Sequence, residues 1–221
     1  MFIGHFAVAL GSKKAAPKVS LGTLFLSVTF VDLLWPLFLI LGIEHVRISP
    51  GNTAVTPLDF YDYPVSHSLL AVLGWSAAFG GIYYLLRNEK RGALILGFGV
   101  LSHWILDFFT HRPDLPLAPW SAMKAGLGLW YSVPFTVIVE VGMFILALYW
   151  YLRTTSAKDR TGLWSFWTWV VFVTAVYAAN IFGPPPPSSE ALGYGGLAGW
   201  LFLPWGYWID RHRRMKQAAA L

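Results

Sequence analysis

The stretch LGTLFLSVTFVDLLWPLFLILGI, residues 21–43, is long enough to cross a membrane and contains one charged residue, Asp32. A transmembrane helix needs roughly 20 consecutive, mostly apolar residues. An ionisable side chain inside such a span is costly to bury and usually serves a function. The stretch therefore predicts a membrane protein with a polar site inside the bilayer.

Composition supports this class. The chain has 221 residues, of which 56% are hydrophobic and 12% are charged, and its mean hydropathy is +0.55. A soluble protein has about 25% charged residues. The absence of cysteine excludes disulfides and thiolate metal sites. The net charge of +5 resides in short loops between apolar runs, so it indicates membrane topology and not a nucleic-acid partner.

The apolar runs predict an all-α, polytopic helical bundle with about six transmembrane helices. The expected spans are 20–42, 66–86, 91–109, 130–152, 163–182 and 192–209. Residues 1–10 are too short to span and lack the basic start of a signal peptide, so they predict a short re-entrant half-helix. With no soluble segment apparent, residues 1–221 are expected to form one transmembrane domain.

Basic residues are divided unevenly between the predicted loops. Thirteen of the 16 Lys and Arg residues lie on one side of a six-span chain, and only Arg47, Arg112 and Lys124 lie on the other. Basic loops of membrane proteins face the cytoplasm. Both termini are therefore predicted to be cytoplasmic.

The third predicted span contains His103 and Asp107. Residues four apart share one face of a helix, as two ligands of one metal ion require. A buried hydrogen bond between the two side chains is the alternative. His111 follows one turn later, close to the helix-ending Pro113, and is a candidate catalytic residue at the outer lip or part of a polar rim.

Other polar residues are expected at similar depth. Pro36 removes the helical partner of the Asp32 carbonyl, which predicts a kink beside the carboxylate. Because the spans contain no basic residue apart from Arg91 at the very start of the third, Asp32 is left with a metal ion, a histidine or a retained proton as its partner. At about 1.5 Å per residue, Asp32 and Glu140 each lie about 15 Å below the outer surface. Glu140 could be a general base, a ligand, or a hydrogen-bonding partner of its neighbours.

These residues predict a metal centre in the outer half of the bilayer. His67 begins the second span on the outer side, and His5 would reach about mid-depth in a half-helix. Imidazole with carboxylate suits Zn²⁺, Mn²⁺ or Fe²⁺, and zinc is the usual choice for hydrolysis. The pocket is expected to open to the extracytoplasmic side.

The chain resembles a known family in the ordered set His5, Asp32, Ser66-His67-Ser68 and Ser102-His103-Trp104-Ile105-Leu106-Asp107. It is similar over residues 1–115 to a bacterial inner-membrane family of membrane-bound metal-dependent hydrolases. The resemblance implies a multi-pass protein of the bacterial inner membrane and a reaction class, but no substrate. The metal-binding half of the chain would be residues 1–115.

The order of these residues also resembles the ligand order of zinc-dependent phospholipases C. By that likeness Asp32, His67, His103 and Asp107 would hold one zinc ion, and His5 would join a second ion bridged by Asp107. Those enzymes are soluble and have further His and Glu ligands. Here only His111 and Glu140 are present to take those places.

The sequence thus predicts a membrane-embedded metal-dependent hydrolase acting on a lipid or a membrane-associated ester or phosphoester. Its surroundings would be the lipid bilayer, and its oligomeric state is left open. One alternative is a transporter in which the same residues bind a cation or relay protons. The other is a scaffold protein with a structural metal.

Overall fold

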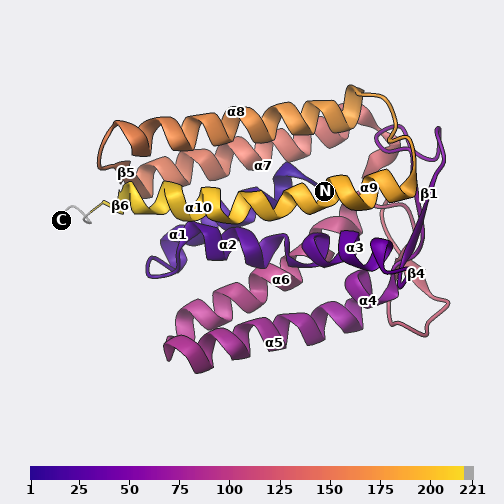
Figure 1. Ribbon diagram of the computed structural model, residues 1–221, viewed down its shortest axis with the longest axis horizontal. Coiled ribbons are helices and arrows are strands. Elements are labelled where there is room, and N and C mark those ends of the chain that lie inside the picture. Colours follow the sequence, from indigo (N-terminus) through magenta and orange to yellow (C-terminus); the bar gives the residue numbers. More distant parts are fainter. Residues whose placement is uncertain (217–221) are drawn as a thin grey trace.

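The computed structural model describes residues 1–216 and confirms an all-α helical bundle (Figure 1). Within these residues, four helices are long and apolar enough to cross a membrane. They are α5 (Leu69–Arg87), α6 (Lys90–Thr110), α7 (Val133–Thr154) and α8 (Arg160–Phe182). α5 packs along α6, and both run along the long axis of the molecule, as α7 and α8 do (Figure 1).

The first predicted span is broken into α2 (Leu21–Val28) and α3 (Phe30–Ile40), which meet at an angle of 57°. The break falls at Thr29, and α3 continues through Pro36, so the expected kink lies earlier in the chain. Ser27 and Thr29 donate their hydroxyls to carbonyls of α2, the Leu24 and Phe25 oxygens. Such back-bonding bends helices. Asp32 consequently lies in the first turn of a new helix.

A short buried helix, α1 (Ile3–Ala15), fills the interior of the bundle and packs against α2, α6 and α7. Its 13 residues extend about 20 Å, less than the thickness of a bilayer. Met1 is 7% exposed and lies inside the bundle, whereas Lys13 lies toward the end where most basic residues gather. Burial of Met1 does not test the prediction that both termini are cytoplasmic, which remains a prediction.

The last predicted span, 192–209, is not one apolar α-helix. The structure has three consecutive pieces that follow the long axis (Figure 1), namely α9 (Ser189–Gly196), the 3₁₀ helix η2 (Leu197–Leu201) and α10 (Phe202–Arg211). Glycine lowers helix stability but permits close approach. A Cβ on Gly206 would lie 2.8 Å from the Gly22 Cα, so α10 and α2 touch through their backbones. Counting α2 and α3 as one broken span, the described residues contain up to five spans.

Short strands close the two ends of the bundle. The segment between the first two predicted spans forms an antiparallel hairpin of β1 (His45–Ile48) and β2 (Leu58–Asp62), followed by the one-turn helix α4 (Pro64–His67). β3 (Leu115–Pro116) pairs with β4 (Lys124–Ala125), which precedes the 3₁₀ turn η1 (Leu129–Tyr131). At the other end, β5 (Thr155–Ala157) pairs with β6 (Arg213–Met215).

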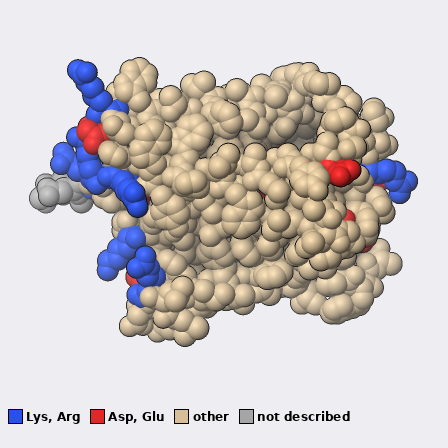
Figure 2. All heavy atoms as spheres, viewed as in Figure 1, with Lys and Arg blue, Asp and Glu red and all other residues tan. Residues whose placement is uncertain are grey.

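Figure 2 shows Lys and Arg gathered at the end that holds β5 and β6. We call this part the basic end. It collects the basic residues around the junctions of α1 with α2, of α5 with α6 and of α7 with α8, at the helix ends and in the connecting loops, together with those at and after the end of α10. The uneven division of basic residues in the sequence thus becomes a division between two ends of the bundle. The side of the membrane that each end faces remains a prediction.

Candidate metal centre

The structure brings five of the predicted residues together where α1, α3, α4 and α6 meet. We call His5, Asp32, His67, His103 and Asp107 the polar cluster. Their nitrogen and oxygen atoms form two groups that could each hold an ion, with all atoms of a group within 4.8 Å of one another. One group is Asp32, His67 and His103; the other is His5, His103 and Asp107. His103 belongs to both, so the two groups adjoin.

His103 is oriented by the break between α2 and α3. Its Nδ1 lies 2.8 Å from the Val28 carbonyl oxygen, and since a carbonyl only accepts, Nδ1 carries the proton. The Nε2 lone pair then faces Asp107 Oδ2 at 3.1 Å and Asp32 Oδ1 at 3.4 Å. Within residues 1–216 this buried Nε2 has no hydrogen-bond partner. A lone pair converging with carboxylate oxygens is the arrangement of a metal ligand.

His67 is oriented by a chain of hydrogen bonds that starts at Glu44. Ser66 Oγ donates to Glu44 Oε2 at 2.6 Å and lies 2.6 Å from His67 Nδ1. Because the hydroxyl proton is committed to the carboxylate, Ser66 accepts from His67 Nδ1–H. His67 Nε2 is thereby free and lies 3.4 Å from Asp32 Oδ1. An outer carboxylate that fixes a histidine tautomer is typical of metal sites.

Glu44 was missed by the sequence reasoning. It is fully buried, and its Oε1 accepts the main-chain N–H groups of Val65 and Ser66 at 2.7 Å each. The carboxylate therefore holds the start of α4 as well as the Ser66 hydroxyl. No spacing in the sequence connects Glu44 with Ser66, because the hairpin β1–β2 lies between them.

Asp107 belongs to the second group of the polar cluster, and its two carboxylate oxygens face different neighbours. Its Oδ1 is 3.2 Å from His5 Nε2 and 2.5 Å from the Met1 amino nitrogen, while its Oδ2 faces His103. The His5 and His103 rings stack with centroids 3.7 Å apart. Among the described residues, neither His5 nitrogen has a hydrogen-bond partner. The two oxygens of Asp107 thus serve different neighbours.

His111 lies just beyond the end of α6, beside the polar cluster. Its Nδ1 is 2.9 Å from Asp114 Oδ1, which also accepts the Tyr63 hydroxyl at 3.1 Å. Burial lowers the pKa of His111 although the Asp114 carboxylate opposes the shift, so the ring is neutral at pH 7. Burial likewise raises the pKa of Tyr63 well above its usual value, and its hydroxyl stays protonated. The second nitrogen, His111 Nε2, lies 3.9 Å from Asp107 Oδ2.

Glu140 is buried in α7 and bonds to α1. Its Oε2 accepts the main-chain N–H of Phe2 at 2.8 Å and of Gly4 at 3.2 Å. A carboxylate at the start of a helix satisfies free N–H groups and favours the helix dipole. Of the three roles expected for Glu140, the contacts show the bond to its neighbours, and it belongs to neither group of ligand atoms.

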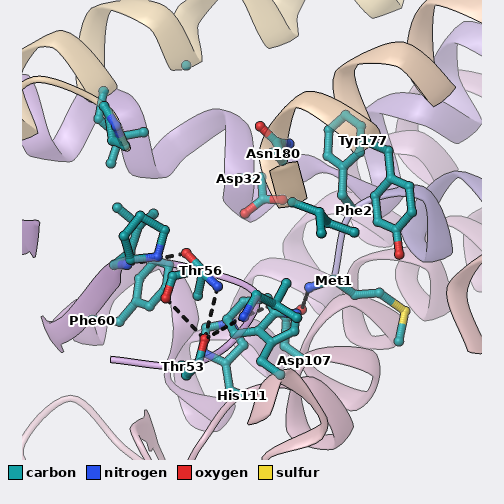
Figure 3. A pocket seen from close by; sticks show the side chains of 18 of the residues that line it. Met1, Phe2, Asp32, Thr53, Thr56, Phe60, Asp107, His111, Tyr177 and Asn180 are labelled. Carbon is teal, nitrogen blue, oxygen red and sulfur yellow. Dashed lines mark hydrogen bonds and ion pairs between the residues drawn. The ribbon is translucent and has the colours of Figure 1, made fainter. Parts of the chain in front are cut away.

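A cavity of about 660 Å³ adjoins the polar cluster. Figure 3 shows Asp32, Asp107 and His111 around it, with Tyr177 and Asn180 of α8 also lining it. The Asp32 side chain is 40% exposed, whereas those of His103 and Asp107 are nearly inaccessible. The loop between β1 and β2 forms another wall, where Thr53 Oγ1 donates to the Thr56 carbonyl. The polar cluster therefore meets the cavity chiefly at Asp32.

Comparison with known proteins gives a family. The model of a family described as YdjM inner membrane protein matches residues 64–184, more than half of the chain. No curated protein and no solved structure matches. The matched part contains His67, His103 and Asp107 and runs farther toward the C-terminus than the resemblance over residues 1–115, while His5 and Asp32 precede it. The chain is an integral membrane protein and belongs to the YdjM inner membrane protein family.

Proposed function

We propose that this protein is a metal-dependent hydrolase whose centre lies within the membrane and acts on a lipid ester or phosphoester. The supporting observation is His103, whose buried Nε2 has no hydrogen-bond partner among residues 1–216 and faces the carboxylates of Asp32 and Asp107. Leaving such an atom unpaired costs about 1–3 kcal/mol. A bound cation would remove this cost and neutralise the two carboxylates.

The donor set fits a divalent ion. Asp32, His67 and His103 form one group of converging atoms, and they would bind the ion together with Asp107, whose Oδ2 lies 3.1 Å from His103 Nε2. Zinc is preferred, and manganese or iron is also compatible with nitrogen and oxygen donors. When bound there, the ion would supply a water molecule with a pKa near 7 and would polarise the bond to be cleaved. The exposed side of Asp32 favours a catalytic centre over a structural one, because catalytic zinc keeps an open position.

The residues beside the polar cluster have distinct tasks in this proposal. Neutral His111 would accept a proton on Nε2, while Asp114 holds its Nδ1–H and stabilises the charged ring. Glu140 would keep α1, and with it His5, in place through the Phe2 and Gly4 amides. His111 is thus the proposed base, and Glu140 has a positioning role.

The cavity favours an amphiphilic substrate. Its volume falls within the roughly 300–1,000 Å³ of small-molecule sites. Asp32, His67 and His111 contribute polar groups on one side, whereas the rest of the lining includes Leu33, Pro36, Ile181, Leu192 and Phe202. A lipid has a polar head group that matches the polar side of the cavity and a hydrocarbon chain that matches its apolar lining.

The decisive experiment measures metal in the purified protein and its hydrolysis of phospholipid and acyl-ester lipids. We expect the wild type to contain a stoichiometric divalent metal, and His103→Ala to lose both metal and hydrolysis. His45→Ala is the matched control, because His45 is an exposed histidine that pairs with Asp62. A wild type that hydrolyses these lipids without metal would contradict the proposal.

A transporter is the second candidate, because the polar cluster adjoins a broken helix pair, α2 and α3. Transporters bind ions at such breaks. The two candidates separate in sealed vesicles. Uptake of protons or cations that His103→Ala abolishes, without any hydrolysis, would favour the transporter.

A further inference from the structure

We propose that the opening between α8 and the α9–η2 segment is a binding site for one acyl chain, through which a lipid enters sideways from the bilayer. We call this opening the α8–α9 portal and define it by Tyr177, Ala179 and Ile181 of α8 and by Leu192 and Gly196 of α9. The proposal rests on the hydrolase function for the binding of the lipid head group. It adds the route by which the lipid enters and the site that its acyl chain occupies.

The portal exists because α8 contacts only part of the C-terminal helical path. Toward the basic end, Trp205 of α10 donates its indole N–H to the Ser165 carbonyl of α8 at 3.0 Å. The contact continues to Phe172 and Phe202, whose ring centroids are 6.1 Å apart. Beyond Phe202, residues of α8 and of α9–η2 line the same cavity from its two sides. Figure 2 shows a hollow on this flank, between α8 and the α9–η2–α10 path of Figure 1.

Glycines hold the far wall of the portal against α3. A Cβ on Gly196 would lie 2.6 Å from Pro36 Cγ, and one on Gly199 would lie 3.1 Å from Leu33 Cδ2. Larger residues at these positions would push α9–η2 away from α3 and toward α8. Because glycine has no side chain, α9–η2 packs closely against α3, and the portal between α9–η2 and α8 stays open.

The chemistry of the portal matches a hydrocarbon chain. Its walls are apolar apart from the exposed Asn180 and the hydroxyl of Tyr177. The outer face of α8 beside it is apolar as well, with Val171 67% exposed and Phe182 73% exposed. Exposed apolar helix faces of this kind lie against lipid. A chain in the portal therefore passes from the bilayer to the cavity without crossing a charged surface, and its polar group arrives at Asp32.

The test uses the whole protein, stripped of metal, in vesicles of phosphatidylethanolamine and phosphatidylglycerol that carry a photoreactive diazirine in the acyl chain. After illumination, labelled residues are mapped by mass spectrometry. We expect label on Leu33 and Tyr177, which are 2% and 6% exposed and which line the cavity. Val171 reports ordinary contact with surrounding lipid and should be labelled in every sample.

Two tryptophan variants on adjacent residues provide the matched comparison. Ala179 and Ala178 are both exposed on α8, but only Ala179 lines the cavity. Ala179→Trp should abolish labelling of Leu33 and Tyr177 and leave that of Val171 intact, whereas Ala178→Trp should change neither. Wild-type label confined to outward residues such as Val171, or equal effects of the two variants, would overturn the portal. Because no metal is present, this result is independent of whether the hydrolase proposal holds.

Discussion

Buried Lys and Arg side chains at the basic end and buried His side chains in the polar cluster differ in their surroundings. Lys13 donates to the Val19 carbonyl at 2.7 Å and pairs with Asp210 at 2.7 Å. Arg213 donates to Thr155 and Gly162 and lies over the rings of two aromatic residues. In the polar cluster, by contrast, His103 Nε2 and both His5 nitrogens have no hydrogen-bond partner among residues 1–216. Buried charged side chains that have hydrogen-bond partners stabilise the fold, whereas buried nitrogen atoms without such partners are available to bind a ligand.

The largest effect that could break this comparison is stabilisation by metal. Adding Zn²⁺ to metal-stripped protein at about 100 times its Kd should stabilise the wild type by about 2.7 kcal/mol, because only the folded state has the site. His103→Ala should gain nothing, and Arg213→Ala should gain the full increment. Thermal denaturation in detergent measures all three. An equal gain in His103→Ala would mean that zinc binds elsewhere.

Next in size is the loss of Arg213 itself. Arg213→Ala should destabilise the protein by about 2 kcal/mol, because the buried Thr155 hydroxyl and Gly162 carbonyl oxygens lose their charged donor. Its metal content should stay at the wild-type level. Arg214→Ala, at the exposed neighbouring position, serves as the control in the same denaturation experiment. Loss of metal from Arg213→Ala would show that the two regions are not independent.

A subtler change targets the tautomer of His67. Glu44→Gln lets an amide donate to Ser66 Oγ, whose own proton then turns toward His67 Nδ1 and moves the ring proton to Nε2. We expect metal affinity to fall about tenfold, the lower range for such outer partners. Titration with a competing chelator measures this affinity. Glu89→Gln is the control, because Glu89 caps α6 through Gly92 far from the polar cluster, and an equal loss there would contradict the relay.

The smallest effect is expected at an exposed pair. His45 and Asp62 lie 2.7 Å apart, but their side chains are 48% and 42% exposed. Asp62→Asn should change stability by no more than about 1 kcal/mol, the usual limit for surface ion pairs, and should leave metal content unchanged. Denaturation and metal analysis of this variant give the baseline against which the three larger effects are measured. A loss of metal would extend the site to the β1–β2 hairpin.

The sequence predicts the parts of this protein that follow from local pattern. Apolar length predicts the long helices, and the four-residue spacing places His103 and Asp107 on one face of α6. Partners from distant loops are a different matter, because the path of the β1–β2 hairpin decides that Glu44 meets Ser66. Asp114 was missed for a similar reason, since it acts through a turn after α6.

Other differences come from tertiary context. Depth along a helix predicts Glu140 near Asp32, but depth does not state which way a side chain faces, and Glu140 faces the start of α1. Proline suggests a kink at Pro36, whereas hydroxyl back-bonding places the bend at Thr29. The C-terminal span is apolar enough to predict one helix, but its glycines let it follow α2 and α3 closely as three pieces.

The bend at Thr29 has a mechanical consequence. One residue before it, the Val28 carbonyl anchors His103, and three residues after it, Asp32 faces the same imidazole. Any rotation of α3 about this joint would change the distance between a carboxylate and a ring that are tethered to opposite arms of the hinge. An ion bound between them would fix the angle between α2 and α3. Binding or release of the ion would therefore shift the position of the whole of α3.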